Sequence, residues 1–326
     1  MRNRWLPVGV LLTVGAGTAD AQSGVAARCT AQQVEVQDVC QKAVDLFNYM
    51  APQLGAAIAG GNATLGQASV LGGLGHFSLG LRVNAVLGAV PDFDDNTTDD
   101  ISAAGAMRSR IATMDAPIPM PVVDAAIGLF EGFPVGLTHV GGLDALVSAF
   151  YVPKYDDESV TLDTPDGSLK FGYGARLGLL REAGAVPAVS LTYLVRELPS
   201  LSITGVVDEE NAASAGLQDF KLKTTSTRIV IGKHLGFLGI ALGAGQDTYE
   251  TTAQVLAQLG AAQASPFGFA QKITRTNIFA DVNFKIIQLE IGQVSGGDAI
   301  GTYNTFEPTK AGESYTYGSV GFRIGF

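Results

Sequence analysis

Residues 315–326, the last stretch of this chain, alternate between apolar and small or charged side chains. Counting back from the final residue in steps of two, the apolar set is Phe326, Ile324, Phe322 and Val320. The residues between them are Gly325, Arg323, Gly321 and Ser319. A repeat of two is the side-chain period of a β-strand, so the pattern predicts a strand whose two faces meet different surroundings.

This terminal pattern resembles the C-terminal signature strand of bacterial outer-membrane β-barrel proteins, which ends in Phe with apolar residues at alternate positions before it. The resemblance implies an all-β chain that forms a transmembrane antiparallel up-and-down β-barrel, preceded by an export signal. It also implies that Phe322, Ile324 and Phe326 form an assembly signal, which the barrel-assembly machinery would read.

The N-terminus has the features of a signal peptide. Arg2 and Arg4 precede an apolar run over residues 5–16, and residues 19–21 form an Ala-Asp-Ala cleavage site. We therefore predict a signal peptide over residues 1–21 and localisation to the bacterial outer membrane. The alternative is an N-terminal membrane anchor, but the apolar run is short for a spanning helix and small residues follow it.

Composition limits the possible partners. Hydrophobic residues make up 47% of the chain, yet Gly or charged residues interrupt its apolar regions every few positions. Alternation in a barrel reconciles these facts, because lipid-facing residues are apolar without any continuous apolar run. The formal net charge of -10 argues against nucleic acid as a partner. We expect outer-membrane lipid as the main partner, with a small-molecule solute as a further one.

Residues 22–71 differ from the rest of the chain. Apolar residues recur at helical spacing between Val36 and Met50, and Pro52 is expected to end or kink that helix. A Gly-rich stretch over residues 55–66 follows. Two placements stay open: this segment either plugs the barrel lumen or packs on the periplasmic rim.

The two cysteines lie in this N-terminal segment. A disulfide between Cys29 and Cys40 is plausible in an exported chain, because the periplasm is oxidising. Their spacing of eleven places them about three helical turns apart, so one of them must lie outside a straight helix. With three His in the whole chain and none near these cysteines, we expect no metal site and no cofactor.

The barrel is predicted over residues 72–326, with about ten strands within a range of eight to twelve. Long and short connections alternate between them, which is the pattern of external loops and periplasmic turns. A soluble β-sandwich also alternates, but it does not explain the export signal, the terminal Phe and this loop pattern together. The strands are predicted at 75–87, 121–130, 140–152, 169–179, 189–196, 220–233, 238–245, 277–285, 287–292 and 315–326. The long connections are predicted at 89–119, 153–167, 197–218, 251–270 and 295–312.

The polar face of each predicted strand should line the lumen. No predicted lipid face carries a charge, and the predicted lumen set has an excess of basic residues. The lumen-facing candidates are His76, Arg82, Lys170, Arg176, Arg196, Arg228, Asp281, Lys285, Glu290 and Arg323. The only Trp lies at position 5, so an interfacial girdle would use other aromatic residues, such as Tyr151, Tyr193, Tyr315 and Tyr317.

No catalytic motif accompanies the three scattered histidines, so we do not expect an enzyme. A ten-stranded barrel is narrow, and its glycine-rich lumen faces leave some room inside. We predict a narrow channel or transporter for small anionic or hydrophobic or amphipathic solutes. The alternatives are a non-transporting barrel that is structural or presents surface loops and, less favoured, a barrel-embedded lipid hydrolase or acyltransferase.

The order of N-terminal segment and barrel is similar to that of the FadL-type long-chain fatty-acid transporters, in which a hatch precedes the barrel. The likeness covers this order and the Gly/Asn-rich junction Gly60-Gly61-Asn62-Ala63. It implies that residues 22–71 act as a hatch. Fewer strands are predicted here than that family has, so neither its substrate nor its binding residues carry over.

Overall fold

The computed structural model describes residues 24–92, 101–156, 160–208, 212–297 and 300–325. The predicted signal peptide and Phe326 lie outside these residues. The helical part consists of α1 (Ala27–Thr30), a 3-10 turn η1 (Val34–Val36) and α2 (Gln37–Ala59). No helix among the described residues is both long and apolar enough to cross a membrane.

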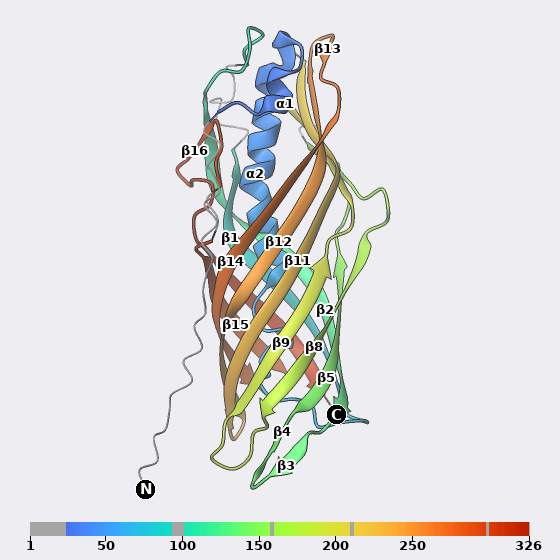
Figure 1. The fold of residues 1–326 in the computed structure, drawn as a ribbon, viewed down its shortest axis with the longest axis vertical. Coiled ribbons are helices and arrows are strands. Elements are labelled where there is room, and N and C mark those ends of the chain that lie inside the picture. Colours follow the sequence, from blue (N-terminus) through green and yellow to red (C-terminus); the bar gives the residue numbers. More distant parts are fainter. Residues whose placement is uncertain (1–23, 93–100, 157–159, 209–211, 298–299, 326) are drawn as a thin grey trace, which may run out of the picture.

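Ten strands of the described chain close into one antiparallel ring, which confirms the predicted β-barrel (Figure 1). Each strand pairs with the next, and the last pairs back with the first, so the ring has no free edge. In order they are β1 (Phe77–Pro91), β2 (Arg110–Phe130), β5 (Gly142–Tyr151), β8 (Leu169–Leu180), β9 (Ala188–Glu197), β11 (Ala213–Leu235), β12 (Leu238–Leu259), β14 (Phe267–Phe284), β15 (Ile287–Ser295) and β17 (Tyr315–Gly325).

The two ends of the ring differ. At the end that we call the turn end, the connections after β8, β11 and β14 are short, and the one after β2 holds the hairpin of β3 (Phe133–Val135) and β4 (Thr138–Val140). At the opposite end, the loop end, the connections carry five short strands. These are β6 (Tyr155–Asp156), β7 (Val160–Asp163), β10 (Leu201–Asp208), β13 (Ala262–Gln263) and β16 (Thr305–Glu307).

Several strands run much farther toward the loop end than the sequence predicted. The predicted loop 251–270 is largely strand, because β12 continues to Leu259 and β14 begins at Phe267. The predicted loop 89–119 is likewise shortened by β1 and β2. The apolar alternation stops before these strands do, since the outward residues of the extension are polar, as at Thr248, Glu250 and Thr252.

Three prolines in the extended part of β2 explain why the sequence analysis did not predict a strand there. Pro117, Pro119 and Pro121 are spaced by two, so their missing N–H groups all lie on one edge of the strand. β2 pairs with β1 along this whole stretch, but its pairing with β5 begins only at Val122. The missing N–H groups of the prolines therefore face the edge of β2 away from β1. Along this stretch, no described strand pairs with that edge, so no hydrogen bond is lost.

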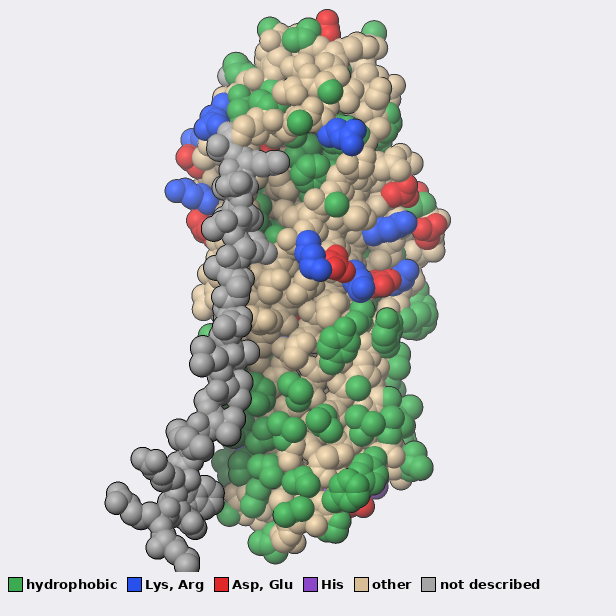
Figure 2. Space-filling view, viewed as in Figure 1, with side chains coloured by type: hydrophobic (Ala, Val, Ile, Leu, Met, Phe, Trp, Pro, Cys, Tyr) green, Lys and Arg blue, Asp and Glu red, His purple; other side chains and the backbone are tan. Residues whose placement is uncertain are grey.

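The outer wall of the ring is apolar over its turn-end half. Leu81, Ile229, Leu242 and Phe322, on four different strands, are each about half exposed. Above this apolar band, charged side chains cross the outer face (Figure 2). Lys272 lies 2.8 Å from Glu250, which lies 3.7 Å from Lys223, and Lys170 lies 3.5 Å from Glu197. Lys223 and Glu197 are opposite one another on neighbouring strands, so these five residues form one charged row.

The tyrosines follow strand parity. Tyr151 and Tyr193 are exposed on the outer wall, at 55% and 52%. Tyr315 and Tyr317 are buried, so their predicted place in an outer girdle is wrong. They share the inward face of β17 with Ser319, and Tyr317 donates a hydrogen bond of 2.8 Å to Asn277 Oδ1 across the interior.

Candidate functional site: the filled barrel interior

The N-terminal segment occupies the barrel interior. α2 descends from the loop end between the strands (Figure 1), contacts β11, β12 and β1, and is followed by residues 60–71 inside the ring. The helix runs through Pro52 to Ala59, so the prediction that Pro52 could end it is wrong. Ala51, Pro52 and Gln53 are all buried, and this packing against the surrounding wall outweighs the hydrogen bond that Pro52 lacks.

Glycines let this backbone approach the wall. Gly60 has φ +54°, a left-handed conformation that ends α2 without steric cost. A Cβ built on Gly55 would lie 2.6 Å from the ring of Tyr249, and one built on Gly61 would lie 2.3 Å from the Glu290 carboxyl carbon. The Gly-rich stretch thus provides close contact rather than empty space.

Two arginines cap the C-terminus of α2. Arg196 Nη1 donates to the carbonyl oxygens of Ile58 and Ala59 at 3.2 and 2.6 Å, and Arg228 Nη1 donates to that of Ala59 at 3.3 Å. The last carbonyls of a helix lack intrahelical partners and carry partial negative charge. The wall therefore supplies both the hydrogen bonds and the positive charge that this helix end needs.

Two neighbouring carboxylates hold the next residues. Glu290 accepts hydrogen bonds from the backbone N–H groups of Gly61 and Asn62 at 3.0 and 2.6 Å. Asp281, opposite Glu290 in the ladder, accepts one from Asn62 Nδ2 at 2.6 Å. Arg82 Nη1 donates to the Asn62 carbonyl oxygen at 2.7 Å. Both polar groups of the Asn62 peptide and its side chain are thus bound to the wall.

The segment is also held near the turn end. The backbone N–H of Leu71 lies 3.2 Å from each carboxylate oxygen of Asp144. Arg176 Nη1 donates to the Gln67 carbonyl oxygen at 3.4 Å. Gly178 leaves room for Val70, because a Cβ at Gly178 would lie 2.7 Å from Val70 Cγ1.

Four interior arginines pair with aspartates that the sequence analysis did not identify. Asp124 lies 2.8 Å from Arg82 and 3.0 Å from Arg196. The other two pairs are Arg176 with Asp144 at 2.7 Å and Arg228 with Asp247 at 2.6 Å. These aspartates offset the charge of four of the basic lumen residues that the sequence predicted. Asp247 continues the inward alternation of Gly243 and Gly245, but the predicted strand ended before it.

The predicted lumen candidates fall into three groups. Arg82, Arg176, Arg196, Arg228, Asp281 and Glu290 are buried in the interior. Lys170 is exposed in the outer charged row, because it is the second residue of β8, where the wall ends and its side chain reaches Glu197. His76 and Lys285 are exposed at the turn end, where they line a pocket of about 580 Å³ together with Arg323.

The loop end anchors α2 separately. The Asp38 carboxylate accepts hydrogen bonds from the backbone N–H groups of Ser102 and Met107 at 3.0 and 2.9 Å. Asp45 accepts backbone hydrogen bonds from Tyr303 and Asn304 at 3.0 and 2.8 Å. Burial raises the pKa of Asp45 above its usual range, although these hydrogen bonds act in the opposite direction.

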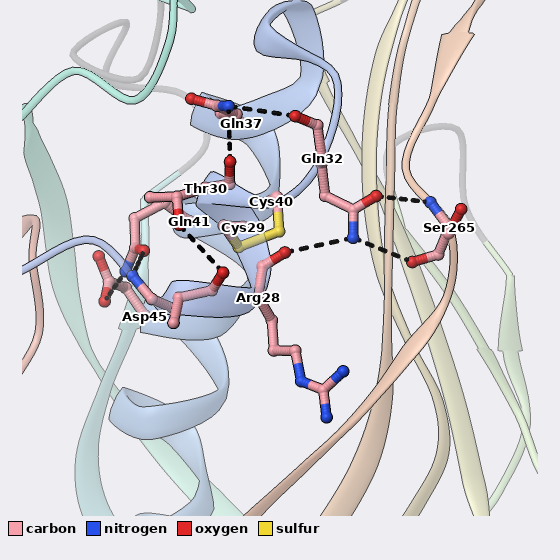
Figure 3. The surroundings of a disulfide bond; sticks show 11 residues. Arg28, Cys29, Thr30, Gln32, Gln37, Cys40, Gln41, Asp45 and Ser265 are labelled. Atoms are coloured by element: carbon pink, nitrogen blue, oxygen red, sulfur yellow. Dashed lines mark hydrogen bonds between the residues drawn. A yellow bond between two sulfur atoms is a disulfide. The ribbon is translucent and has the colours of Figure 1, made fainter.

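The predicted disulfide is confirmed. Cys29 and Cys40 are bonded, with a Cα–Cα distance of 5.6 Å, and they lie in α1 and α2 respectively, as their spacing required. Beside the bond, Gln32 Oε1 accepts a hydrogen bond of 2.9 Å from the backbone N–H of Ser265, in the connection before β14 (Figure 3). The disulfide thus joins α1 to α2, and the Gln32 hydrogen bond joins the helical segment to the connection before β14.

The histidines are not gathered into a reactive cluster. His234 Nδ1 lies 2.7 Å from Glu182, and His139 Nε2 lies 3.7 Å from Glu131, both near the turn end. Hydrogen bonds to the His234 side chain and backbone and to Lys233 lower the pKa of Glu182, although burial, the largest single effect, raises it. Within the described part of the chain, no group of three or more His, Cys, Asp or Glu is placed to hold a metal ion.

No protein-family model and no curated protein matches the chain. Solved outer-membrane proteins resemble it at low scores. A TodX deltaS2S3 mutant monoaromatic hydrocarbon channel is 9% identical, with a TM-score of 0.32, and the match covers 76% of this chain and 67% of that one. The Pseudomonas putida toluene transporter TodX is 10% identical, with a TM-score of 0.26 and coverages of 77% and 89%. The outer membrane protein opdK from Pseudomonas aeruginosa is 10% identical, with a TM-score of 0.17 and coverages of 77% and 99%. Scores at this level carry no argument about function.

Proposed function

We propose that this protein is an outer-membrane channel that residues 60–71 hold closed as a plug. One observation carries the proposal: the segment that fills the closed ring has no regular secondary structure and is bound to the wall largely through hydrogen bonds. Water can replace such bonds when the segment moves, and no helix or strand within residues 60–71 has to unfold first. α2 then serves as the anchor from which the plug hangs.

The outer wall supports placement in a membrane. On β11, Ile229 lies six residues from Lys223 in the charged row and six from Leu235 at the turn end. Strands of about 10 residues, tilted by about 45°, cross a bilayer core, and an apolar band about 25 Å tall is typical of such barrels. We infer that the turn end faces the periplasm, that residues 1–21 are an export signal, that residues 22–71 are the N-terminal segment that carries the plug, and that residues 72–326 are the barrel.

A charge placed on the apolar band tests this orientation. Ile229→Lys is expected to weaken folding into lipid vesicles by about 2–4 kcal/mol, the cost of a Lys near the bilayer midplane. Thr252→Lys, on the outer face beyond the charged row, is the matched control and should change little. The measurement is reversible urea unfolding in vesicles. Equal effects of the two variants would contradict the proposed membrane position.

The interior charges bear on the solute. Because Arg82, Arg176, Arg196 and Arg228 each lie against an aspartate, they do not form a free cationic wall for an anion. Of the described interior arginines, Arg275 has only the carbonyl oxygens of Gly296 and Gly312 as acceptors, whereas Lys285 and Arg323 line the open turn-end pocket without a carboxylate partner among the described residues. We therefore propose that the solute is small and either anionic or amphipathic, rather than purely hydrophobic.

Locking the plug to the wall tests the channel itself. A Cβ built on Gly178 would lie 3.4 Å from Val70 Cβ, close to the Cβ–Cβ range of about 3.5–4.5 Å in disulfides. The oxidised V70C/G178C variant should show no channel openings in planar bilayers, whereas the wild-type protein and the reduced variant should conduct. The single variants V70C and G178C control for the chemistry of an added cysteine. The wild-type protein treated with reductant controls for opening of the native disulfide.

The alternative is a barrel that does not conduct and serves to present its loop end. The anchoring of α2 favours it, because Asp38, Asp45 and the disulfide hold the helix in place beside a packed interior. The same bilayer measurement decides between the two. Absence of openings in the wild-type protein and in the reduced variant would overturn the channel proposal and leave the non-transporting barrel.

A further inference from the structure

The turn-end pocket brings together residues from five separate parts of the chain. It has a volume of about 580 Å³ and opens where the plug segment ends. Gln67 comes from that segment, His76 precedes β1, and His234 is the penultimate residue of β11. Lys285 lies in the turn after β14, and Arg323 lies on β17. Four of these five side chains can carry positive charge, and no described Asp or Glu lines the pocket.

The charges in this pocket are unlike those of Arg82, Arg176, Arg196 and Arg228, and they also differ from Arg275, which is buried and bonded to the carbonyl oxygens of Gly296 and Gly312. Lys285 and Arg323 have no carboxylate oxygen of a described residue within 4.0 Å, whereas four interior arginines each have an aspartate at 3.0 Å or less. Among the described contacts, Arg323 Nη1 has the neutral Gln67 Oε1 as its hydrogen-bond acceptor, at 3.0 Å. His234 is held by Glu182, so Arg323, Lys285 and His76 are the groups open to a ligand.

We infer that this pocket binds a small oxyanion, a carboxylate or a phosphate, through Arg323 and Lys285. A guanidinium presents paired N–H donors to such a ligand, and a hydrogen bond to a charged acceptor is about twice as strong as one to a neutral acceptor. The anion therefore displaces the Gln67 side chain from Arg323. Because Gln67 belongs to the segment that fills the ring, binding is coupled to release of the plug. This coupling rests on the proposed channel function, but anion binding does not.

Direct titration tests the site. The folded barrel in uncharged detergent is titrated with acetate and, separately, with inorganic phosphate, and heat of binding is recorded by calorimetry. Arg323→Gln and Lys285→Gln should each weaken binding by about tenfold, which corresponds to about 1.4 kcal/mol. Lys310→Gln, an exposed lysine at the loop end, removes the same charge elsewhere and should leave binding unchanged. The stronger of the two probes identifies the class of ligand.

Two results would overturn the site: no saturable binding of either probe, or binding that both pocket variants leave intact. Correct folding of each variant is established beforehand by its heat-modifiable mobility on a gel. Neither result depends on conductance, so a failed channel proposal and a failed anion site are distinguishable.

The coupling has its own test. Gln67→Ala removes the side chain that competes for Arg323 and should tighten anion binding severalfold. By reciprocity, the anion should raise amide hydrogen exchange over residues 66–71 in the wild-type protein. Unchanged affinity in Gln67→Ala together with unchanged exchange would show that the pocket binds its anion without any link to the plug.

Discussion

Replacing Asp124 with alanine is expected to lower the free energy of unfolding by about 3–5 kcal/mol, the range for removing one partner of a buried ion pair. Asp124 lies 2.8 Å from the Arg82 guanidinium and accepts a hydrogen bond of 3.0 Å from Arg196, and each of these arginine side chains is 1–2% exposed. Without the carboxylate, two positive charges remain close together in the interior. Unfolding in urea, followed by the heat-modifiable gel mobility of the barrel, measures the loss.

The expected loss is large because both arginines also bind the segment inside the ring, Arg82 in the plug and Arg196 at the end of α2. Arg82 holds the Asn62 carbonyl oxygen and Arg196 holds those of Ile58 and Ala59. Asp163→Ala is a matched control, since Asp163 pairs with Lys154 at 2.6 Å on the exposed surface of the loop end. Exposed pairs contribute little to stability. A loss in Asp124→Ala no larger than that in Asp163→Ala would contradict the importance of the interior network.

The outer face of the barrel could be predicted closely from sequence. Lipid selects for apolar side chains at every second position, so the outward set of β15, for example, is directly visible as Ile287, Leu289 and Ile291. All three are at least 41% exposed on the wall. This one-dimensional signal depends only on the local strand and its surroundings, which is why the number and order of the ring strands followed from it.

The inner face could not be predicted in the same way. The residue type at an inward position depends on a contact partner that is distant in sequence. Examples are Arg228 with Asp247 on the neighbouring strand and Glu290 with Gly61 across the interior. The alternation along the strand shows that such a side chain points inward, but it does not show which residue the side chain contacts. The inward tyrosines show the same limit, because Tyr317 is apolar enough for a lipid face yet bonds Asn277 inside.

The glycine-rich junction was one of the sequence signals that pointed to a plug, beside the helical spacing before it and the order of segment and barrel. Its composition does not reveal which wall residues the backbone approaches. The geometry of Gly60 and Gly61 supplies the reason for their absence of side chains: Asn84 and Glu290 lie where a Cβ would stand. The position of the segment inside the ring therefore depends on these inward residues, of which Glu290 makes two of the backbone contacts.

Glu290→Ala should consequently free the plug while leaving the barrel folded. The substitution leaves the backbone N–H groups of Gly61 and Asn62 without their acceptor, and each buried donor left unpaired costs about 1–3 kcal/mol. Asp281, which holds the Asn62 side chain, loses a neighbouring negative charge, and this relief offsets part of the cost. A net local loss of about 2 kcal/mol corresponds to a roughly 30-fold increase in opening.

Hydrogen exchange separates local release from global unfolding. Peptides covering residues 60–71 should exchange roughly 30-fold faster in Glu290→Ala, whereas peptides from β12 and β14 should keep their protection, because the ladder between those strands is untouched. Glu250→Ala is the matched control: it removes the same side chain from the outer face of β12, two strands away in the ring, where it contacts Lys272 rather than the plug. If both variants exchange alike over residues 60–71, the wall carboxylate does not hold the segment, and the plug must be retained by α2 and its loop-end anchors instead.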